Sequence, residues 1–324
     1  MPRPRIGPGE ILVKVMASGI CGSDVLEWYR LKTAPRVLGH EATGVIVEVG
    51  EGVRYRVGDR VFVSHHVPCG SCHYCKRGHE TACETLHTTN YDPGGFAEFI
   101  RVPKLNVEKG VYLLPEEISF EEGTFIEPVA CVVRAQRLAE VGKGDTVLIL
   151  GSGLSGLLHL QLARLKGAER IFTTDISDYR LKAAKKFGAD ATINANDDVV
   201  ERLRQLNGGR LADKVIVCTG AASASGQALK CVDRGGTILF FAVPEPSVKI
   251  PMPLADFWRN EITILTSYGG APRDLEESLD LLSRKSLNVK EMITHRLPLE
   301  KTGLGFKLVA EAGDSLKVII EPQR

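Results

Sequence analysis

The chain has 324 residues, of which 41 are basic and 40 acidic, so that its formal net charge is +1. This balance gives no electrostatic basis for binding nucleic acid, and no window approaches the ~18 consecutive apolar residues of a membrane span. Because a chain of this length is usually too long to fold around a single hydrophobic core, two domains are expected.

The first part of the chain, up to about residue 115, reads as a mainly β region. Short apolar runs are separated by Gly and Pro, and they predict strands at 11–15, 44–50, 60–63 and 97–103. Lys14 breaks the apolar run near the N-terminus, so no signal-peptide pattern is present there and a cytoplasmic location is expected.

From residue 119 onward, helical and β patterns alternate. Ser119 followed by Glu122 is a capping-box pattern, which predicts the start of a helix. The later apolar runs are near-continuous, as is typical of parallel strands buried on both faces. They predict strands at 146–150, 170–174, 214–220, 237–243 and 261–267. Beyond residue 270 come two helical patterns and a last strand at 316–320, which we expect to rejoin the first domain.

A glycine-rich motif, GSGLSG, follows a strand pattern and opens a helical one. Gly151 suits a tight turn, Gly153 allows the backbone to approach a pyrophosphate, and Gly156 allows close packing of helix on strand. Asp175 ends the next strand, where a carboxylate would accept hydrogen bonds from the adenosine ribose and disfavour a 2′-phosphate. The motif therefore predicts NAD in preference to NADP. A glycine-rich turn without a nucleotide is the alternative.

Further cofactor contacts are predicted from position alone. Arg180 follows Asp175 by five residues, where its charge would soften the preference against NADP. Ligands bind at the carboxyl ends of parallel strands, although strand ends also simply carry turns. The remaining candidates lie in the glycine motif or at strand ends: Leu154, Ser155, Thr219, Gly220, Val243 and Ser267.

Four cysteines, Cys69, Cys72, Cys75 and Cys83, have the spacing C-x2-C-x2-C-x7-C. In a reducing cytoplasm such a cluster indicates a metal rather than disulfides, and four thiolates suit a closed tetrahedral zinc site. An iron–sulfur cluster is one alternative, but its motif places the fourth Cys after three residues with Pro following, which Cys83 does not match. Unliganded surface thiols are the other.

A second set of possible metal ligands is scattered along the chain. Cys21 lies in SGICGSD, His40 and Glu41 lie in LGHEATG, and Glu127 lies in FIEPVAC. Taken singly, the Cys suits a buried apolar position, the His a turn and Glu127 a helix surface. Spacing alone does not join them into one site.

The motifs GICGSD, LGHEATG, VGDRV, GGFAEF and LGSGLSG, together with the cysteine loop, occur in the order typical of one family. The chain resembles the zinc-containing medium-chain dehydrogenases/reductases, especially the sorbitol/polyol and threonine dehydrogenase branch. The resemblance implies an α/β fold, in which a doubly wound Rossmann sheet is inserted in a mainly β GroES-like catalytic domain. The implied domains are 1–126 (catalytic, zinc-binding), 127–268 (NAD-binding) and 269–324 (return to the catalytic domain).

The resemblance also implies two zinc ions per chain. The four-cysteine loop would hold a structural zinc, and Cys21, His40 and Glu127 would hold a catalytic one. Glu41 matches a family Glu that swings onto the metal or stays beside it, and Asp24 matches an Asp that orients the ligating His.

The implied reaction is the oxidation of a secondary alcohol, such as a polyol, a sugar alcohol or threonine, to a ketone. Zinc would act as a Lewis acid so that the alkoxide forms near neutral pH, and hydride would pass to the nicotinamide of NAD. Ser23 matches the hydroxyl that begins the family's proton relay. Leu26 stands where many relatives have the next His, so the usual relay is interrupted.

Two histidines, His65 and His66, precede the cysteine loop. In threonine dehydrogenases a His three residues before the first loop Cys lies near the substrate, and His66 holds that position. We predict that His66 lines the substrate pocket and shuttles protons, with His65 pointing elsewhere. A pair of surface histidines is the alternative.

Two other functions fit the same fold. A quinone-reductase-like enzyme should lack Cys21, His40 and Glu127 as a set, and a non-catalytic zinc-binding protein should lose the nucleotide motif or those ligands; the sequence keeps both. The expected partners are a small alcohol or ketone, neither nucleic acid nor membrane, and further copies of the chain in a tetramer or a dimer. Fold and motif do not select the substrate.

Overall fold

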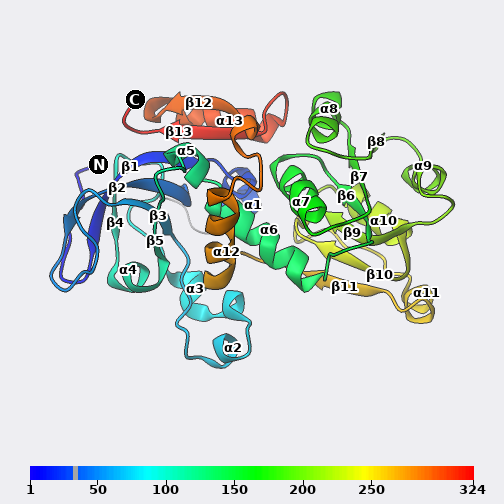
Figure 1. Cartoon of the computed structure of the whole chain (residues 1–324), viewed down its shortest axis with the longest axis horizontal. Coiled ribbons are helices and arrows are strands. Elements are labelled where there is room, and N and C mark those ends of the chain that lie inside the picture. The colour runs from blue at the N-terminus through cyan, green and yellow to red at the C-terminus, as the bar shows by residue number, and fades with distance from the viewer. Residues whose placement is uncertain (32–35) are drawn as a thin grey trace. The chain divides into compact units, whose positions relative to one another are not determined.

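The computed structural model describes residues 1–31 and 36–324 and divides into two compact units. Unit 1 comprises Met1–Ala130 and Gly269–Arg324, and unit 2 comprises Cys131–Tyr268 (Figure 1). Helix α6 (Ile126–Leu138) crosses the boundary between them, so its first turn belongs to unit 1.

Unit 1 is built on a mixed sheet, which has seven strands among the residues that the structure describes. They are Ile11–Gly19 (β1), Glu41–Val49 (β2), Arg60–Ser64 (β3), Phe99–Val102 (β4), Val111–Leu113 (β5), Ile293–Pro298 (β12) and Lys317–Glu321 (β13). The order is β12-β13-β1-β2-β3-β5, with β4 paired to β1. Because β13 pairs with β1, the C-terminal segment lies in the same sheet as the N-terminal one.

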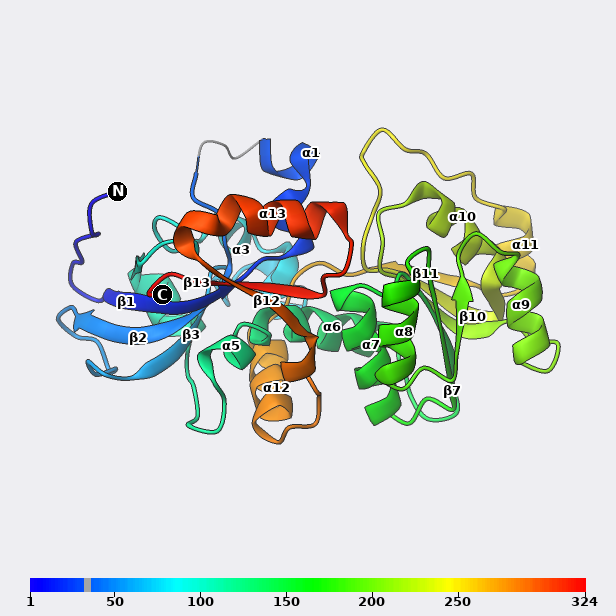
Figure 2. The same cartoon turned by 90° about the horizontal axis from the view of Figure 1, so that it is seen from above.

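Helices fill the connections of unit 1. They are Glu27–Arg30 (α1), His73–Lys76 (α2), Glu84–Thr88 (α3), Lys104–Gly110 (α4), Phe120–Gly123 (α5), Pro272–Ser283 (α12) and Thr302–Glu311 (α13). Alternate β1 side chains, Ile11, Val13 and Val15, are fully buried in one apolar cluster. Helix α13 covers β12 and β13 (Figure 2), and Phe306 on this helix meets the Phe96 ring at 5.5 Å between centroids.

The predicted capping box at Ser119 is confirmed. Ser119 Oγ accepts from the Glu122 backbone N–H at 3.2 Å, and Glu122 Oε2 accepts from the Ser119 N–H at 3.0 Å. The helix it starts, α5, ends at Gly123, and α6 begins only at Ile126. Pro128 gives the physical reason, since proline is tolerated in the first turn of a helix and not in its interior.

Unit 2 contains the parallel sheet that the apolar runs predicted. Its strands are Thr146–Leu150 (β6), Arg170–Asp175 (β7), Ala191–Asn194 (β8), Ala212–Val217 (β9), Val232–Phe240 (β10) and Thr263–Thr266 (β11). All pairs are parallel, in the order β11-β10-β9-β6-β7-β8. The chain therefore winds outward in both directions from β6, as in a Rossmann fold.

The helices of unit 2 connect successive strands. They are Leu154–Leu165 (α7), Asp178–Lys186 (α8), Val199–Leu206 (α9), Ala222–Cys231 (α10) and Leu254–Arg259 (α11). An apolar cluster joins β6 and β9 to α9 and α10, with Leu148, Val215, Leu203 and Ala228 fully buried. Burial on both faces is what the continuous apolar runs indicated.

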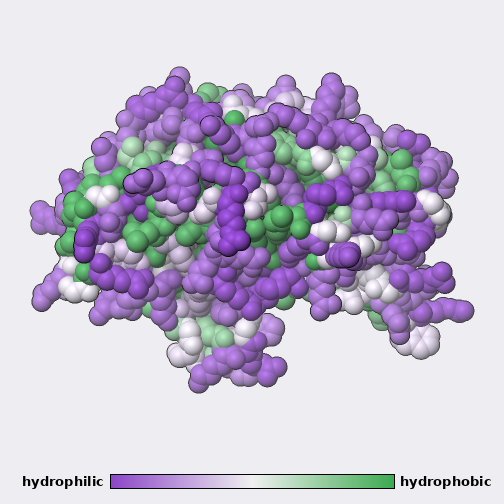
Figure 3. Space-filling view, in the orientation of Figure 1, coloured by the Kyte–Doolittle hydropathy of each residue, from purple (hydrophilic) through white to green (hydrophobic). Residues whose placement is uncertain are grey.

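Hydrophilic residues predominate on the face shown in Figure 3, with smaller apolar areas between them. Within residues 1–31 and 36–324, no helix has both the length and the apolar character needed to cross a bilayer.

One buried histidine of unit 2 makes a pH-dependent contribution to stability. His159 is fully buried, its Nδ1 lies 3.2 Å from Gln136 Nε2, and its ring meets Phe241 edge-on at 4.7 Å. Burial, with a smaller contribution from the charge of Lys166, lowers the pKa of His159 to about 3. The ordinary pKa of histidine is ~6.5, so below that pH the unfolded chain binds a proton that the folded chain does not.

The stability that neutral His159 confers is thus fully present above pH ~6.5 and is lost as the pH falls toward 3. Between pH 7.5 and 5, we expect His159→Gln to lose about 2 kcal/mol less stability than the wild type. Urea unfolding at matched pH values measures this difference. Parallel pH dependences of the two proteins would contradict the assignment.

Candidate active site

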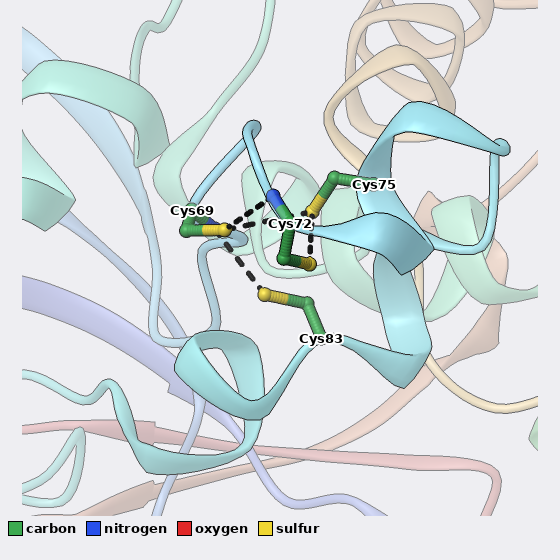
Figure 4. Close-up of side chains that lie close together, drawn as sticks. All are labelled: Cys69, Cys72, Cys75 and Cys83. Atoms are coloured by element: carbon green, nitrogen blue, oxygen red, sulfur yellow. Dashed lines mark hydrogen bonds between the residues drawn. The ribbon is translucent and has the colours of Figure 1, made fainter.

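The four cysteines of the predicted metal loop point toward one another (Figure 4). Cys69 Sγ lies 3.9 Å from Cys75 Sγ, and Cys72 Sγ lies 3.5 Å from Cys75 Sγ. Four sulfurs held ~2.3 Å from one zinc ion in a tetrahedron would be separated by about 3.8 Å. All four sulfurs lie within 4.8 Å of one another, so the predicted clustering is confirmed and the set fits a zinc ion.

Backbone groups of the loop favour thiolate at Cys69, whereas burial raises the pKa of Cys75 to about 12. The N–H groups of Ser71 and Cys72, 3.4 and 3.3 Å from Cys69 Sγ, lower the pKa of Cys69 to about 5. Lys109 Nζ donates to the Cys69 carbonyl and ties the loop to α4. Four sulfur ligands complete a tetrahedral shell around one zinc ion. Such a site therefore has no open position for a substrate.

A second cluster brings together residues far apart in sequence. Gly19 at the end of β1 pairs with Glu41 at the start of β2. Cys21, two residues beyond β1, and His40, one residue before β2, therefore meet at the same end of the sheet. One ligand atom each of Cys21, His40 and Glu41 lies within 4.8 Å of the others. A thiolate, an imidazole and a carboxylate form the donor set of a zinc site that keeps an open position.

Asp24 fixes the orientation of His40. The Asp24 side chain is fully buried, with Oδ1 3.3 Å from His40 Nδ1, and Oδ2 accepts from the Cys21 backbone N–H at 3.1 Å. Burial alone would lower the pKa of His40, but the Asp24 carboxylate outweighs it and raises that pKa well above its ordinary value. With Nδ1 engaged, Nε2 of His40 is the nitrogen left for a metal.

Glu41 forms a buried ion pair that the sequence pattern did not reveal. Lys317 Nζ donates to Glu41 Oε2, and both side chains are 0% exposed. The other oxygen, Oε1, has no hydrogen-bond partner among the described residues. Gly19 leaves the necessary room, since a Cβ there would overlap both Glu41 and Lys317. Glu41 is thus held beside Cys21 and His40 with one oxygen unsatisfied.

Glu127 is not brought into the cluster of Cys21, His40 and Glu41. It lies half-buried in the first turn of α6. The charge of Glu127 nevertheless acts on Tyr91, as do the charges of Asp24 and Glu41. Burial first, and then these three carboxylates, raise the pKa of Tyr91 well above its ordinary value. The role of Glu127 as a zinc ligand therefore stays a prediction.

The prediction that His65 points away from the site is wrong. The His65 ring lies 5.0 Å from the His40 ring and 3.7 Å from the His66 ring, between centroids. Burial, followed by the charges of nearby histidines and arginines, lowers the pKa of His66 to about 3 and that of His65 well below its ordinary value. Both rings are neutral near pH 7. Asn106, fully buried, fixes this segment by donating to the His65 carbonyl at 2.9 Å.

The nucleotide motif has the backbone geometry that its glycines predicted. Gly151 has φ +99°, and a Cβ at Gly156 would overlap the Gly151 carbonyl. Asp175 is 8% exposed, and its Oδ2 and Oδ1 accept from the N–H groups of Ser152 (2.8 Å) and Ser177 (3.0 Å). The carboxylate is therefore fixed beside the glycine turn, at the start of α7, where a dinucleotide's adenosine half would lie.

The other predicted cofactor residues lie at the start of α7 or beyond strand ends of unit 2, and two of them contact the glycine turn. Arg180 lies over Gly153, since a Cβ there would be 3.6 Å from Nη1, and Thr219 lies against Gly151. Val243 is 48% exposed and packs beside Gly220. The strands end earlier than predicted, at Val217 and Phe240, so these residues lie in the loops beyond. Leu154 and Ser155 begin α7, and Ser267 directly follows β11.

Comparison with known proteins agrees with this geometry. Residues 7–115 match the family model of the alcohol dehydrogenase GroES-like domain, and residues 156–284 match that of zinc-binding dehydrogenase. Sorbitol dehydrogenase of Mus musculus is 34% identical over 333 residues, which cover 99% of this chain and 91% of the mouse protein. L-threonine 3-dehydrogenase of Pyrococcus abyssi is 36% identical over 334 residues, which cover 98% and 92%.

A solved zinc-binding dehydrogenase from Sinorhizobium meliloti 1021, bound to NADP, has a similar fold. It aligns with a TM-score of 0.89 and 30% identity over 99% of this chain and 94% of that one.

Proposed function

Because the chain belongs to the zinc-binding alcohol dehydrogenase family, we propose that it oxidises a secondary alcohol, such as a polyol or an amino alcohol, with NAD. The observation that carries the proposal is the Cys21–His40–Glu41 cluster, with Asp24 holding His40. Unlike the closed set of four cysteines, this cluster has mixed donors and an unsatisfied carboxylate oxygen. The names of the sorbitol and threonine relatives support the substrate class.

The residues of the site have separable tasks. When bound, zinc would polarise the substrate oxygen and NAD would accept hydride. Cys21 and His40 would hold the metal, with a carboxylate from Glu41 or Glu127 as third ligand. Ser23, two residues after Cys21, would offer its hydroxyl to the substrate oxygen. His65 and His66, neutral and half-buried, would shape the pocket without adding charge to it.

A screen of alcohols tests the proposal. The purified, zinc-replete protein is assayed for NAD reduction with sorbitol, threonine and a simple secondary alcohol, before and after treatment with a zinc chelator. We expect activity with at least one class and its loss on chelation. A protein with two zinc ions per chain and no activity toward any of the three classes would contradict the proposal.

Preference for NAD should depend on Asp175. A 2′-phosphate beside this buried carboxylate would meet like charge, which costs several kcal/mol. We expect Asp175→Ser to lower the NAD:NADP ratio of kcat/KM by at least about tenfold, because serine keeps an acceptor for the Ser152 N–H without the charge. Initial rates with each cofactor measure the ratio. A wild-type enzyme that prefers NADP would show that Arg180 dominates instead.

We also propose that the chain acts in the cytoplasm and assembles with copies of itself, with a tetramer favoured over a dimer. Strand β11 ends the parallel sheet of unit 2, and α11 beside it leaves Trp258 82% and Leu254 70% exposed. An open sheet edge and large exposed apolar side chains each favour a covering partner. Light scattering coupled to size exclusion tests this, and a monomer at assay concentration would contradict it.

A further inference from the structure

Arg30 contacts the turn that carries Cys21 in a way that the reaction proposed above does not use. Its side chain folds back from α1, and Nε donates to the Ser23 carbonyl at 2.9 Å. Nη2 donates to Ser23 Oγ at 2.8 Å and to Asp24 Oδ1 at 3.0 Å. The guanidinium lies 4.9 Å from the centre of the Tyr29 ring, and the side chain is only 21% exposed. These contacts fix Arg30 on two consecutive residues of the turn.

We propose that Arg30 is a positioning residue that orients the Ser23 hydroxyl as a hydrogen-bond donor to the substrate oxygen. The inference rests on the proposed alcohol oxidation. A hydroxyl has one proton and two acceptor lone pairs, whereas a guanidinium group only donates. Because Nη2 occupies an acceptor position of Ser23 Oγ, the single proton of Ser23 is directed to another acceptor. The cation behind the hydroxyl also strengthens it as a donor.

This arrangement explains how the turn functions with leucine at position 26. Leu26 has no polar side-chain atom, and it is 39% exposed. Arg30 cannot carry a proton in its place, because a guanidinium group keeps its protons at physiological pH. The turn therefore offers an oriented, cation-backed donor to negative charge that develops on the substrate oxygen. The proton that the alcohol itself loses would leave to solvent water, while the Ser23 hydroxyl keeps its own proton and donates it as a hydrogen bond to the alkoxide.

Arg30 has a second contact, which defines the rival explanation. Asp24 Oδ1 accepts from Arg30 and also lies 3.3 Å from His40 Nδ1. If Arg30 acted through Asp24, its loss would disturb His40 and weaken metal binding, as loss of such supporting contacts does by 10- to 100-fold. If it acts through Ser23, its loss changes the rate and its pH dependence while the metal stays bound.

A double-mutant cycle between Arg30 and Ser23 tests the proposal. With the best alcohol, we expect Arg30→Gln to lower kcat/KM about tenfold and Ser23→Ala about a hundredfold. The double variant should be no worse than Ser23→Ala alone, since non-additivity marks residues that act together. The matched control is Arg54→Gln. Arg54 also donates to a hydroxyl, that of Tyr55 at 2.8 Å, and lies over the same ring at 5.0 Å, so its loss should leave kcat/KM unchanged.

Two further measurements separate positioning from general damage. By metal analysis, Arg30→Gln should retain two zinc ions per chain. The midpoint of its pH profile of kcat/KM should shift to higher pH, because the variant lacks the cation that favours negative charge on the substrate oxygen. Arg30→Lys, which keeps the cation, should restore the midpoint of the profile. Additive effects in the cycle, loss of one zinc ion or an unmoved pH profile would each overturn the proposal.

If the wild type oxidises no alcohol, the proposed function fails and this inference fails with it. An active wild type with additive variants removes the inference alone.

Discussion

Lys317→Met should destabilise the protein by about 3–5 kcal/mol, the range for removing one partner of a buried ion pair. Lys317 and Glu41 are both 0% exposed, and their side chains share the space beside Gly19. Methionine fills much of the lysine volume, so the loss comes from the charge left on Glu41 rather than from a cavity. The ammonium group also lies 5.4 Å from the centre of the Phe125 ring, an attraction that methionine does not replace. Urea unfolding of the zinc-free protein measures the change.

Two control variants test this explanation. Lys307→Met removes an exposed lysine that pairs with Glu311 at 3.7 Å one helical turn away, so it should change stability by less than about 0.5 kcal/mol. The double variant Glu41→Gln/Lys317→Met removes both charges and should recover a large part of the loss. If the double variant is as unstable as Lys317→Met, packing rather than charge explains the effect.

The features that local sequence determines were predicted well. Gly151 and Gly156 are needed within a six-residue turn, and Ser119 and Glu122 satisfy each other's backbone groups across one helical turn. The parallel strands of unit 2 are recognisable in the sequence as continuous apolar runs, because burial on both faces leaves no alternation with polar residues. The three strands that were missed, β5, β8 and β12, are short or only partly buried, so their apolar pattern is weak.

The contacts that depend on non-local pairing could not be derived from the residues in isolation. Cys21 and His40 meet because β1 and β2 pair in one register, and spacing alone does not specify that register. Lys317 reaches Glu41 because β13 returns beside β1 from the other end of the chain. One signal was available: a lysine inside the apolar run LKVII suggests a buried charge, which requires a partner. For Arg30, the link to Ser23 spans seven residues and depends on how α1 folds back onto the preceding turn, which the sequence alone does not show.

Two variants, Cys21→Ala and Cys83→Ala, should distinguish the roles of the two predicted metal sites. Each removes one thiolate from its cluster, so each should lower the zinc content from two ions per chain to one. Cys21→Ala should lower kcat/KM by at least about a thousandfold, because Lewis-acid assistance is worth several kcal/mol. Its fold should be kept, since the sheet around β1 and β2 does not depend on that sulfur.

Cys83→Ala should weaken the local fold and leave most of the activity. Cys83 is 1% exposed and holds the loop through the Cys69 N–H at 3.4 Å, so its loss should loosen residues 69–88 and expose them to protease. The folded fraction should nevertheless keep activity within about tenfold of wild type, because a closed shell of four thiolates offers no position to a substrate. Metal analysis, limited proteolysis and initial rates on the same preparations measure all three quantities. If Cys83→Ala abolishes activity while the loop stays protected, or if Cys21→Ala retains it, the assignment of chemistry to the scattered ligands rather than to the conspicuous cysteine loop is wrong.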